Sequence, residues 1–185
     1  VLLSSGDDTG VTVNGTDLDV DPSAYNDLAD GESAVIVYTY DVSDGTVTTP
    51  TTATITITGT NDAPTVGAVT GGSTEDAAAF SVDLLGNSSD PDSSDTLVVS
   101  NVLLSSGDST GVTVNGTDLD VDPSAYNDLA DGESAVIVYT YDVSDGTVTT
   151  PTTATIQISR HNDAPTAGSG TVRSADAAAA RGRHF

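Results

Sequence analysis

Three aspartates in one short loop, Asp90-Pro91-Asp92-Ser93-Ser94-Asp95, are the residues best suited to chemistry. The loop offers three carboxylates in six residues, and the ring of Pro91 restricts its backbone. Calcium takes six to eight hard oxygen ligands from carboxylates and carbonyls in flexible loops. The spacing is therefore typical of part of a calcium site. The simpler interpretation is an exposed acidic turn, and both interpretations stay open on this loop alone.

Two other acidic series compete with this loop: Asp17, Asp19 and Asp21, and their repeat Asp118, Asp120 and Asp122. In each series the aspartates alternate with apolar residues. Side chains along a β-strand point to opposite faces in turn, so all the carboxylates of one series lie on one face. This pattern favours a solvated acidic stripe over a metal site.

Catalytic residue patterns are weak throughout the chain. His161 and His184 have no partner that their spacing suggests, and the chain has no cysteine to act as a nucleophile, thiolate ligand or disulfide. Paired carboxylates could serve a glycosidase, but the aromatic residues that form a sugar pocket are scarce. The sequence predicts a protein that is not an enzyme.

The charge of the chain is strongly one-sided, with 28 acidic residues, four basic residues and a formal net charge of −24. Residues 1–159 carry 26 of the acids and no base, because the four arginines are Arg160, Arg173, Arg181 and Arg183. Such a surface repels nucleic acid and anionic membranes and attracts cations. The chain has no run of 18 apolar residues, so we expect no direct insertion into a membrane. The alternative to cation binding is that the acidic residues only keep the protein soluble.

A long internal repeat sets the domain organisation. Residues 1–65 match residues 102–166 at 60 of 65 positions, so that Asn61-Asp62-Ala63-Pro64 returns as Asn162-Asp163-Ala164-Pro165. A fixed period marks a tandem array, and this period suits one small β-sandwich. We expect an excerpt of a longer protein with three parts: the C-terminal part of a unit that lacks its first strands (1–58), a complete unit (59–159), and the start of a third unit or a disordered tail (160–185).

Strand and turn signals fill each unit. Asn14-Gly15 and Asn115-Gly116 each separate two alternating segments, which is the strongest short hairpin signal. Residues 35–42 form a predicted strand whose inward face carries Ile36, Tyr38, Tyr40 and Val42. We further predict a short helical turn at 23–28, a glycine-rich connector from Gly67 to Gly72 and a strand from Ala77 to Leu85. The fold class is all-β: tandem immunoglobulin- or cadherin-like Greek-key β-sandwich domains, the first one truncated.

Two stretches resemble the VCBS-type repeats of giant bacterial surface proteins, including the RTX adhesins. One is the run from Thr54 to Pro64, and the other extends from Leu119 through Tyr141-Asp142-Val143 to Gly146. The resemblance implies a calcium-dependent, cadherin-like sandwich that acts as one link of a long extender region. It also implies secretion to the bacterial surface and a part in cell adhesion and biofilm formation. The family's terminal glycine- and aspartate-rich repeats are absent from this sequence, and the adhesion target is unknown.

The resemblance to cadherin-type repeats also implies the calcium ligands, because calcium there lies at the joint and draws on both domains. At the first joint the implied ligands are Asp30, Glu32, Asn61, Asp62, Asp90, Asp92 and Asp145. At the second joint they are Glu75, Asp131, Glu133, Asn162 and Asp163. In the second joint Arg160-His161 replaces Gly59-Thr60, and we expect this positive charge to weaken cation binding.

These observations lead to one hypothesis and one alternative. The hypothesis is a structural extender whose joints calcium makes rigid and whose partners are the neighbouring repeats of the same chain. The alternative is a sugar- or protein-binding β-sandwich module of an extracellular protein. That module would need an exposed aromatic platform or a variable loop, whereas near-identical repeats favour a spacer.

Overall fold

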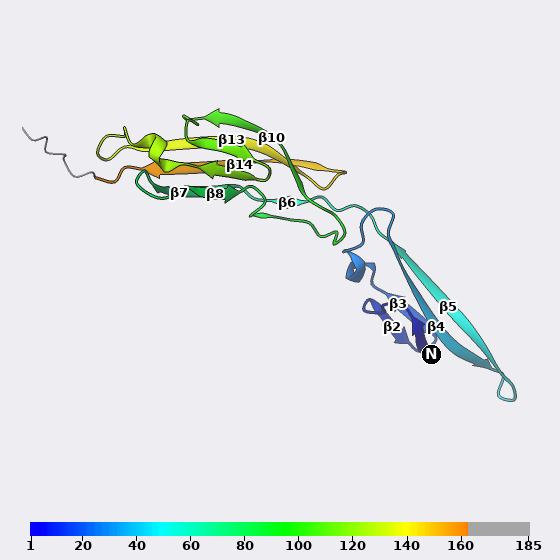
Figure 1. Ribbon diagram of the computed structural model, residues 1–185. Coiled ribbons are helices and arrows are strands. Elements are labelled where there is room, and N and C mark those ends of the chain that lie inside the picture. Colours follow the sequence, from blue (N-terminus) through cyan, green and yellow to red (C-terminus); the bar gives the residue numbers. More distant parts are fainter. Residues whose placement is uncertain (163–185) are drawn as a thin grey trace, which may run out of the picture.

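Two β-rich units follow each other along the chain and meet at a bend near residue 60 (Figure 1). The computed structural model describes residues 1–162. Asp163 and nearly all of the expected third unit or disordered tail lie outside the described residues. Within residues 1–162, no helix combines the length and apolarity needed to cross a membrane.

The second unit is a sandwich of two sheets. One sheet has the strand order β10-β13-β14-β7, the other has the order β11-β12-β8, and β6 and β9 form a short ribbon beside them. The bounds are β6 Thr65–Val66, β7 Val69–Thr74, β8 Phe80–Asp83, β9 Ser88–Ser89, β10 Val98–Ser106, β11 Val112–Asn115, β12 Asp118–Val121, β13 Ser134–Ser144 and β14 Thr149–Ser159. This architecture confirms the predicted all-β sandwich class.

The first unit repeats part of this plan. A three-stranded sheet β1-β4-β5 and a ribbon β2-β3 replace the larger sheets. The bounds are β1 Leu2–Ser5, β2 Val11–Asn14, β3 Asp17–Val20, β4 Ser33–Ser43 and β5 Thr48–Thr58. The predicted helical turns are short 3-10 helices, η1 (Pro22–Tyr25) and η2 (Pro123–Tyr126). Each is capped by the preceding aspartate, whose side chain accepts a hydrogen bond from a backbone N–H.

The two predicted hairpins are confirmed, and their sequence signal is a local one. β2 pairs with β3 and β11 pairs with β12, both antiparallel. Gly15 and Gly116 have φ values of 64° and 63°, a left-handed conformation that glycine adopts without steric cost. The turns therefore fix the register of both ribbons.

The predicted inward face of the tyrosine strand is confirmed in the second unit and only partly in the first. On β13, Ile137, Tyr139, Tyr141 and Val143 are all buried. On β4, Ile36 and Tyr38 are buried, Tyr40 is half-buried and Val42 is 57% exposed. The prediction is wrong for Val42 because no strand equivalent to β8 covers that end of β4 in the described structure.

The predicted glycine-rich connector is wrong, because most of it is a strand. β7 runs parallel to β14 in the register Ala154↔Val69 to Ser159↔Thr74. A Cβ atom at Gly71 would lie 2.4 Å from Cγ2 of Val82 on β8. The glycine therefore permits close approach of the two sheets. The strand predicted over Ala77–Leu85 is shorter than expected, with β8 limited to Phe80–Asp83.

Candidate metal centre

The acidic loop between β9 and β10 gathers its three carboxylates in space. Ligand oxygens of Asp90, Asp92 and Asp95 all lie within 4.8 Å of one another. Asp92 is 1% exposed, and the other two are half-buried. The turn is closed by two hydrogen bonds: the backbone N–H of Asp92 donates to Oδ1 of Asp90 over 3.0 Å, and that of Asp95 donates to the Asp92 carbonyl over 3.1 Å.

Two oxygens in this cluster are buried without a hydrogen bond. Oδ2 of Asp90 and Oδ1 of Asp92 have no hydrogen-bond partner among the described residues. Buried polar atoms are nearly always paired, because their desolvation otherwise costs free energy. Two unpaired carboxylate oxygens from neighbouring side chains are therefore suited to a bound cation.

The joint connects directly to this cluster. The backbone N–H of Asp62 donates to the other oxygen of Asp92, Oδ2, over 2.8 Å. The side-chain amide of Asn61 donates to the Asp62 carbonyl over 2.8 Å and to Oδ2 of Asp145 over 3.1 Å. The joint residues are thus held between the acidic loop and the turn that connects β13 to β14.

Asp145 stays ionised within this arrangement. Its burial acts to raise the pKa, but hydrogen bonds from the Val148 and Thr147 N–H groups and the Asn61 amide outweigh burial and hold the pKa below the ordinary value of 3.8. Oδ1 accepts both N–H groups at 2.6 Å. Asp145 is 9% exposed, so a carboxylate negative charge lies largely buried beside the joint.

The pKa of Asp95 reflects the negative charge of the surrounding carboxylates. Burial raises its pKa, and the negative charges of Asp92, Asp90, Asp145 and Glu32 raise it further. Glu32 belongs to the preceding unit, so the electrostatic field at Asp95 combines both units. Because residues 1–159 contain no lysine or arginine, no basic side chain of that segment neutralises the cluster. A bound cation or a proton would neutralise it.

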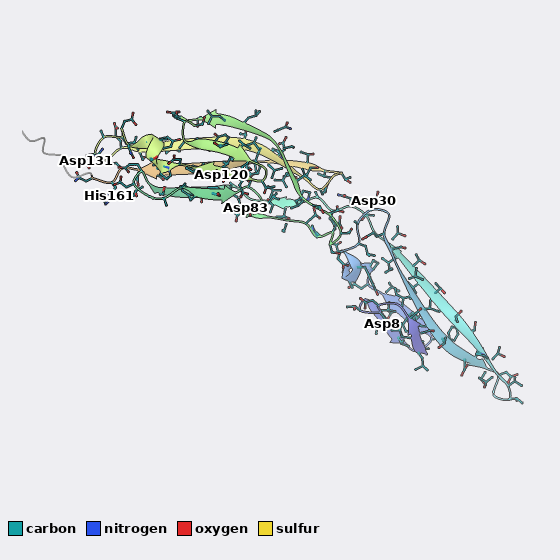
Figure 2. All side chains as sticks on the ribbon, viewed as in Figure 1. Asp8, Asp30, Asp83, Asp120, Asp131 and His161 are labelled. Atoms are coloured by element: carbon teal, nitrogen blue, oxygen red, sulfur yellow. The ribbon has the colours of Figure 1, made fainter. Side chains whose placement is uncertain are left out.

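The preceding unit also contacts the loop through backbone atoms. The Ser93 N–H and hydroxyl both donate to the Asp27 carbonyl, over 3.1 and 3.2 Å. Glu32 is half-buried and accepts from the Ala29 N–H through Oε2 over 3.0 Å. Asp30 is exposed at the bend (Figure 2). The structure thus brings together five of the seven residues implied for the first joint: Asn61, Asp62, Asp90, Asp92 and Asp145. Glu32 acts on the cluster through its charge, and Asp30 makes no hydrogen bond to it in the described structure.

Sequence reasoning left one member out of the implied ligand set, Asp95. The resemblance pointed to the other two aspartates of the loop, although the three-carboxylate spacing had already included Asp95. The backbone carbonyl of Asp27, which faces Ser93, had no side-chain signal that could reveal it.

The second joint is arranged differently, at the far end of the second unit (Figure 2). Glu75 is 1% exposed, and both of its carboxylate oxygens accept from the His161 N–H, over 2.7 and 2.6 Å. Nδ1 of His161 lies 3.2 Å from Oδ2 of Asp76, a pairing across 85 residues that spacing did not reveal. Nη1 of Arg160 donates to the Leu129 carbonyl over 2.5 Å.

The other described ligands implied for the second joint are exposed, unlike Glu75. Asp131 and Glu133 are exposed. Oε2 of Glu133 accepts from the Ala130 N–H over 2.8 Å, which repeats the role of Glu32. Asn162 is exposed, and Asp163 lies outside the described residues.

The competing acidic stripes serve the local fold. Asp17, Asp19 and Asp21 are exposed, as alternation predicts. In the second unit Oδ1 of Asp120 accepts from the Ser81 hydroxyl over 2.6 Å, and Oδ2 accepts from the Asn115 amide over 2.8 Å. These side chains bond to β8 and to the hairpin.

Comparison with protein families agrees with the fold. The sequence profile of the cadherin-like domain matches residues 60–159. The chain belongs to the cadherin-like domain family. A comparison with curated proteins finds no match.

Several solved structures match the chain at low sequence identity. The protocadherin gammaB4 extracellular domain is 13% identical with a TM-score of 0.41, over 86% of this chain and 27% of that chain. Human protocadherin-24 EC1-2 is 15% identical with a TM-score of 0.38, over 88% and 81%. The endo-fucoidan hydrolase MfFcnA4 from glycoside hydrolase family 107 is 19% identical with a TM-score of 0.38, over 86% and 23%. The chain spans about a quarter of the hydrolase and of protocadherin gammaB4.

Proposed function

We propose that the chain is a non-enzymatic spacer of an extracellular bacterial adhesin, in which Ca2+ makes the joint between repeats rigid. The observation that carries the proposal is the Asp92 carboxylate. One of its oxygens accepts the backbone N–H of Asp62 at the joint, and the other is buried without a hydrogen-bond partner among the described residues. A cation bound to that second oxygen would link the acidic loop to the joint through a single side chain.

The mechanism follows from the charges around Asp95. Without a cation, four other carboxylates raise its pKa, which means that they repel its charged form. Asp92 and Asp95 belong to the second unit and Glu32 to the first, so this repulsion opposes close approach of the units. Calcium would replace the repulsion by shared coordination, and the joint would lose its freedom to bend.

The proposed setting follows from affinity and resemblance. Extracellular calcium modules bind with a Kd of about 10⁻⁴–10⁻³ M, so the joint would respond to external calcium. The run from Thr54 to Pro64 supports a surface adhesin, because it resembles the joints of bacterial extender repeats. The partners in this role are the neighbouring repeats of the same chain.

Small-angle scattering and calorimetry of the full chain test the proposal, with millimolar CaCl2 and then with excess EDTA. We expect calcium to raise the Tm measured by calorimetry. In the scattering data, we expect calcium to narrow the range of maximum dimensions that the chain adopts. Asp92→Asn keeps the side-chain shape and removes its charge, so it should weaken calcium binding at least tenfold. Asp19→Asn, an exposed carboxylate on β3, is the matched control and should change nothing.

Two outcomes would contradict the proposal. If calcium changes neither the Tm nor the scattering profile, the acidic residues serve only to keep the protein soluble. An equal response to MgCl2 would point to general screening of charge, because magnesium requires a smaller, near-octahedral site.

A further inference from the structure

The four-stranded sheet of the second unit ends in two edge strands, β10 and β7, that are built differently. β10 pairs with β13 in a register that shifts twice, and Asn101, within the first shift, has a positive φ of 52°. Such irregularities, like charged residues and prolines, keep an edge strand from pairing with another chain. β7 has none of these devices. It pairs with β14 through consecutive residues without a shift, and Val69–Thr74 contains no charged residue and no proline.

A hollow of about 530 Å³ lies beside β7 and is also lined by β8, the edge strand of the other sheet (Figure 1). Its lining includes Gly71, Gly72 and the half-buried Phe80. A Cβ atom at Gly72 would lie 2.8 Å from the Gln157 carbonyl oxygen, so close packing against β14 favours glycine at this position. Because the two glycines have no side chains, the backbone of β7 stays uncovered beside the hollow.

The carboxylates next to the hollow lie beside one another without a basic neighbour. Asp83 lines the hollow and is exposed. The register of β8 with β12 places it directly opposite Asp118, and places Ser81 opposite Asp120. Like charges directly opposite each other destabilise an antiparallel pair. Because residues 1–159 contain no lysine or arginine, a cationic side chain that relieves this repulsion must come from another molecule or from beyond that segment.

We propose that the edge of β7 binds an extended, basic peptide segment of another protein as an added strand. Backbone hydrogen bonds to β7 supply affinity, and alternate side chains of the added strand face the hollow. A lysine or arginine there covers Phe80 with its aliphatic stem and places its charge beside Asp83. A second copy of this chain fits poorly, because its residues 1–159 bring only negative charge.

This site is separate from the proposed calcium joint. None of the implied calcium ligands is among the residues that line the hollow. The hollow and both strands beside it belong to the second unit. The proposal therefore does not depend on the first unit, and it can fail or succeed without any change in the response to calcium.

A labelled heptapeptide, in which lysine alternates with threonine or valine, tests the site by fluorescence anisotropy. The full chain is titrated at constant calcium and about 0.15 M salt, which screens long-range attraction. We expect saturable binding. The same peptide N-methylated at every internal residue keeps its charge and loses its backbone donors, so it should bind about tenfold more weakly or less.

Paired variants of the chain separate pairing at the edge from general attraction to an acidic surface. Thr70→Lys puts a positive charge on the exposed edge of β7 and should weaken binding about tenfold. Thr113→Lys adds the same charge at an exposed residue of β11 and should change little. Asp83→Asn should lower the affinity a few-fold, and Asp17→Asn, exposed on β3, is its matched control.

Three results would overturn the proposal. The first is equal binding of the methylated and unmethylated peptides, or equal losses in Thr70→Lys and Thr113→Lys, since both indicate attraction by charge alone. The second comes from hydrogen exchange: slowed exchange within Val69–Thr74 supports the site, whereas slowed exchange only elsewhere removes it. The third is self-association of the peptide-free chain that Thr70→Lys abolishes, because the edge would then belong to a second copy.

Discussion

Residues 1–58 and 102–159 have nearly the same sequence and different interiors. Ile55 and Ile57 are half-buried, whereas Ile156 and Ile158 are 0% exposed. The difference comes from β7 and β8, which lie before the second copy in the chain and pair with its strands β14 and β12 (Figure 1). Local sequence therefore determines strands and hairpins, and distant strands determine whether those strands form a closed core.

The difference has an energetic consequence. Buried apolar surface contributes about 25 cal/mol per Å², so a copy with an open face gains less on folding. We expect two calorimetric transitions in the full chain, with the first copy unfolding at the lower temperature. Paired substitutions at equivalent positions of the two copies can show which transition belongs to which copy.

The largest expected contrast is between Val143→Asp and Val42→Asp. Val143 is fully buried, so an aspartate there would place an unpaired carboxylate in the core and destabilise the second unit by more than about 4 kcal/mol. At Val42 the aspartate reaches solvent, and the change should be within about 0.5 kcal/mol. Calorimetry at fixed calcium measures both. Equal shifts would mean that the first copy has a closed core in solution.

The pair Ile156→Ala and Ile55→Ala should show a smaller contrast. Truncating a fully buried isoleucine costs about 2–5 kcal/mol, part of which comes from the cavity left behind. The half-buried Ile55 should cost less than half of the value at Ile156, because solvent already reaches it. Denaturant unfolding of each variant gives the two free energies. A larger loss at Ile55 would contradict the comparison.

The pair Tyr141→Phe and Tyr40→Phe isolates one hydrogen bond. The Tyr141 hydroxyl donates to the buried Leu84 carbonyl over 2.7 Å, and its removal should cost about 1 kcal/mol. No leucine of the described residues occupies that position beside Tyr40, so removal of the Tyr40 hydroxyl should be neutral. Denaturant unfolding gives both values, and an equal loss at Tyr40 would contradict the comparison.

The smallest expected effect concerns the pH dependence of Asp120. Hydrogen bonds from the Ser81 hydroxyl and the Asn115 amide lower its pKa below 3.8. A lowered pKa contributes stability that is present above pH 3.8 and is lost as the pH falls through the folded value. Ser81→Ala should move the pKa back toward 3.8, as carboxyl NMR titration can measure.

Sequence patterns predicted the features that depend on neighbouring residues. The Asn-Gly hairpins and the alternating face of β13 follow from local conformational preference and period. β7 could not be predicted, because Gly71 and Gly72 indicate a connector until the strand pairs with β14, more than 80 residues away. The burial of Glu75 against His161 depends on the same long-range pairing. The joint ligands came from resemblance, which omitted Asp95, whereas the spacing of the acidic loop had included it.

The parallel pairing of β7 with β14 affects how the second unit would transmit tension. In their sheet β7 comes first along the chain and β14 comes last, and six residue pairs hold them together over Val69–Thr74. A pull along the chain drags these two strands in opposite directions along their length. Their hydrogen bonds are then loaded together in shear and must break as a group, whereas the bonds of a hairpin pulled open at its end break one at a time.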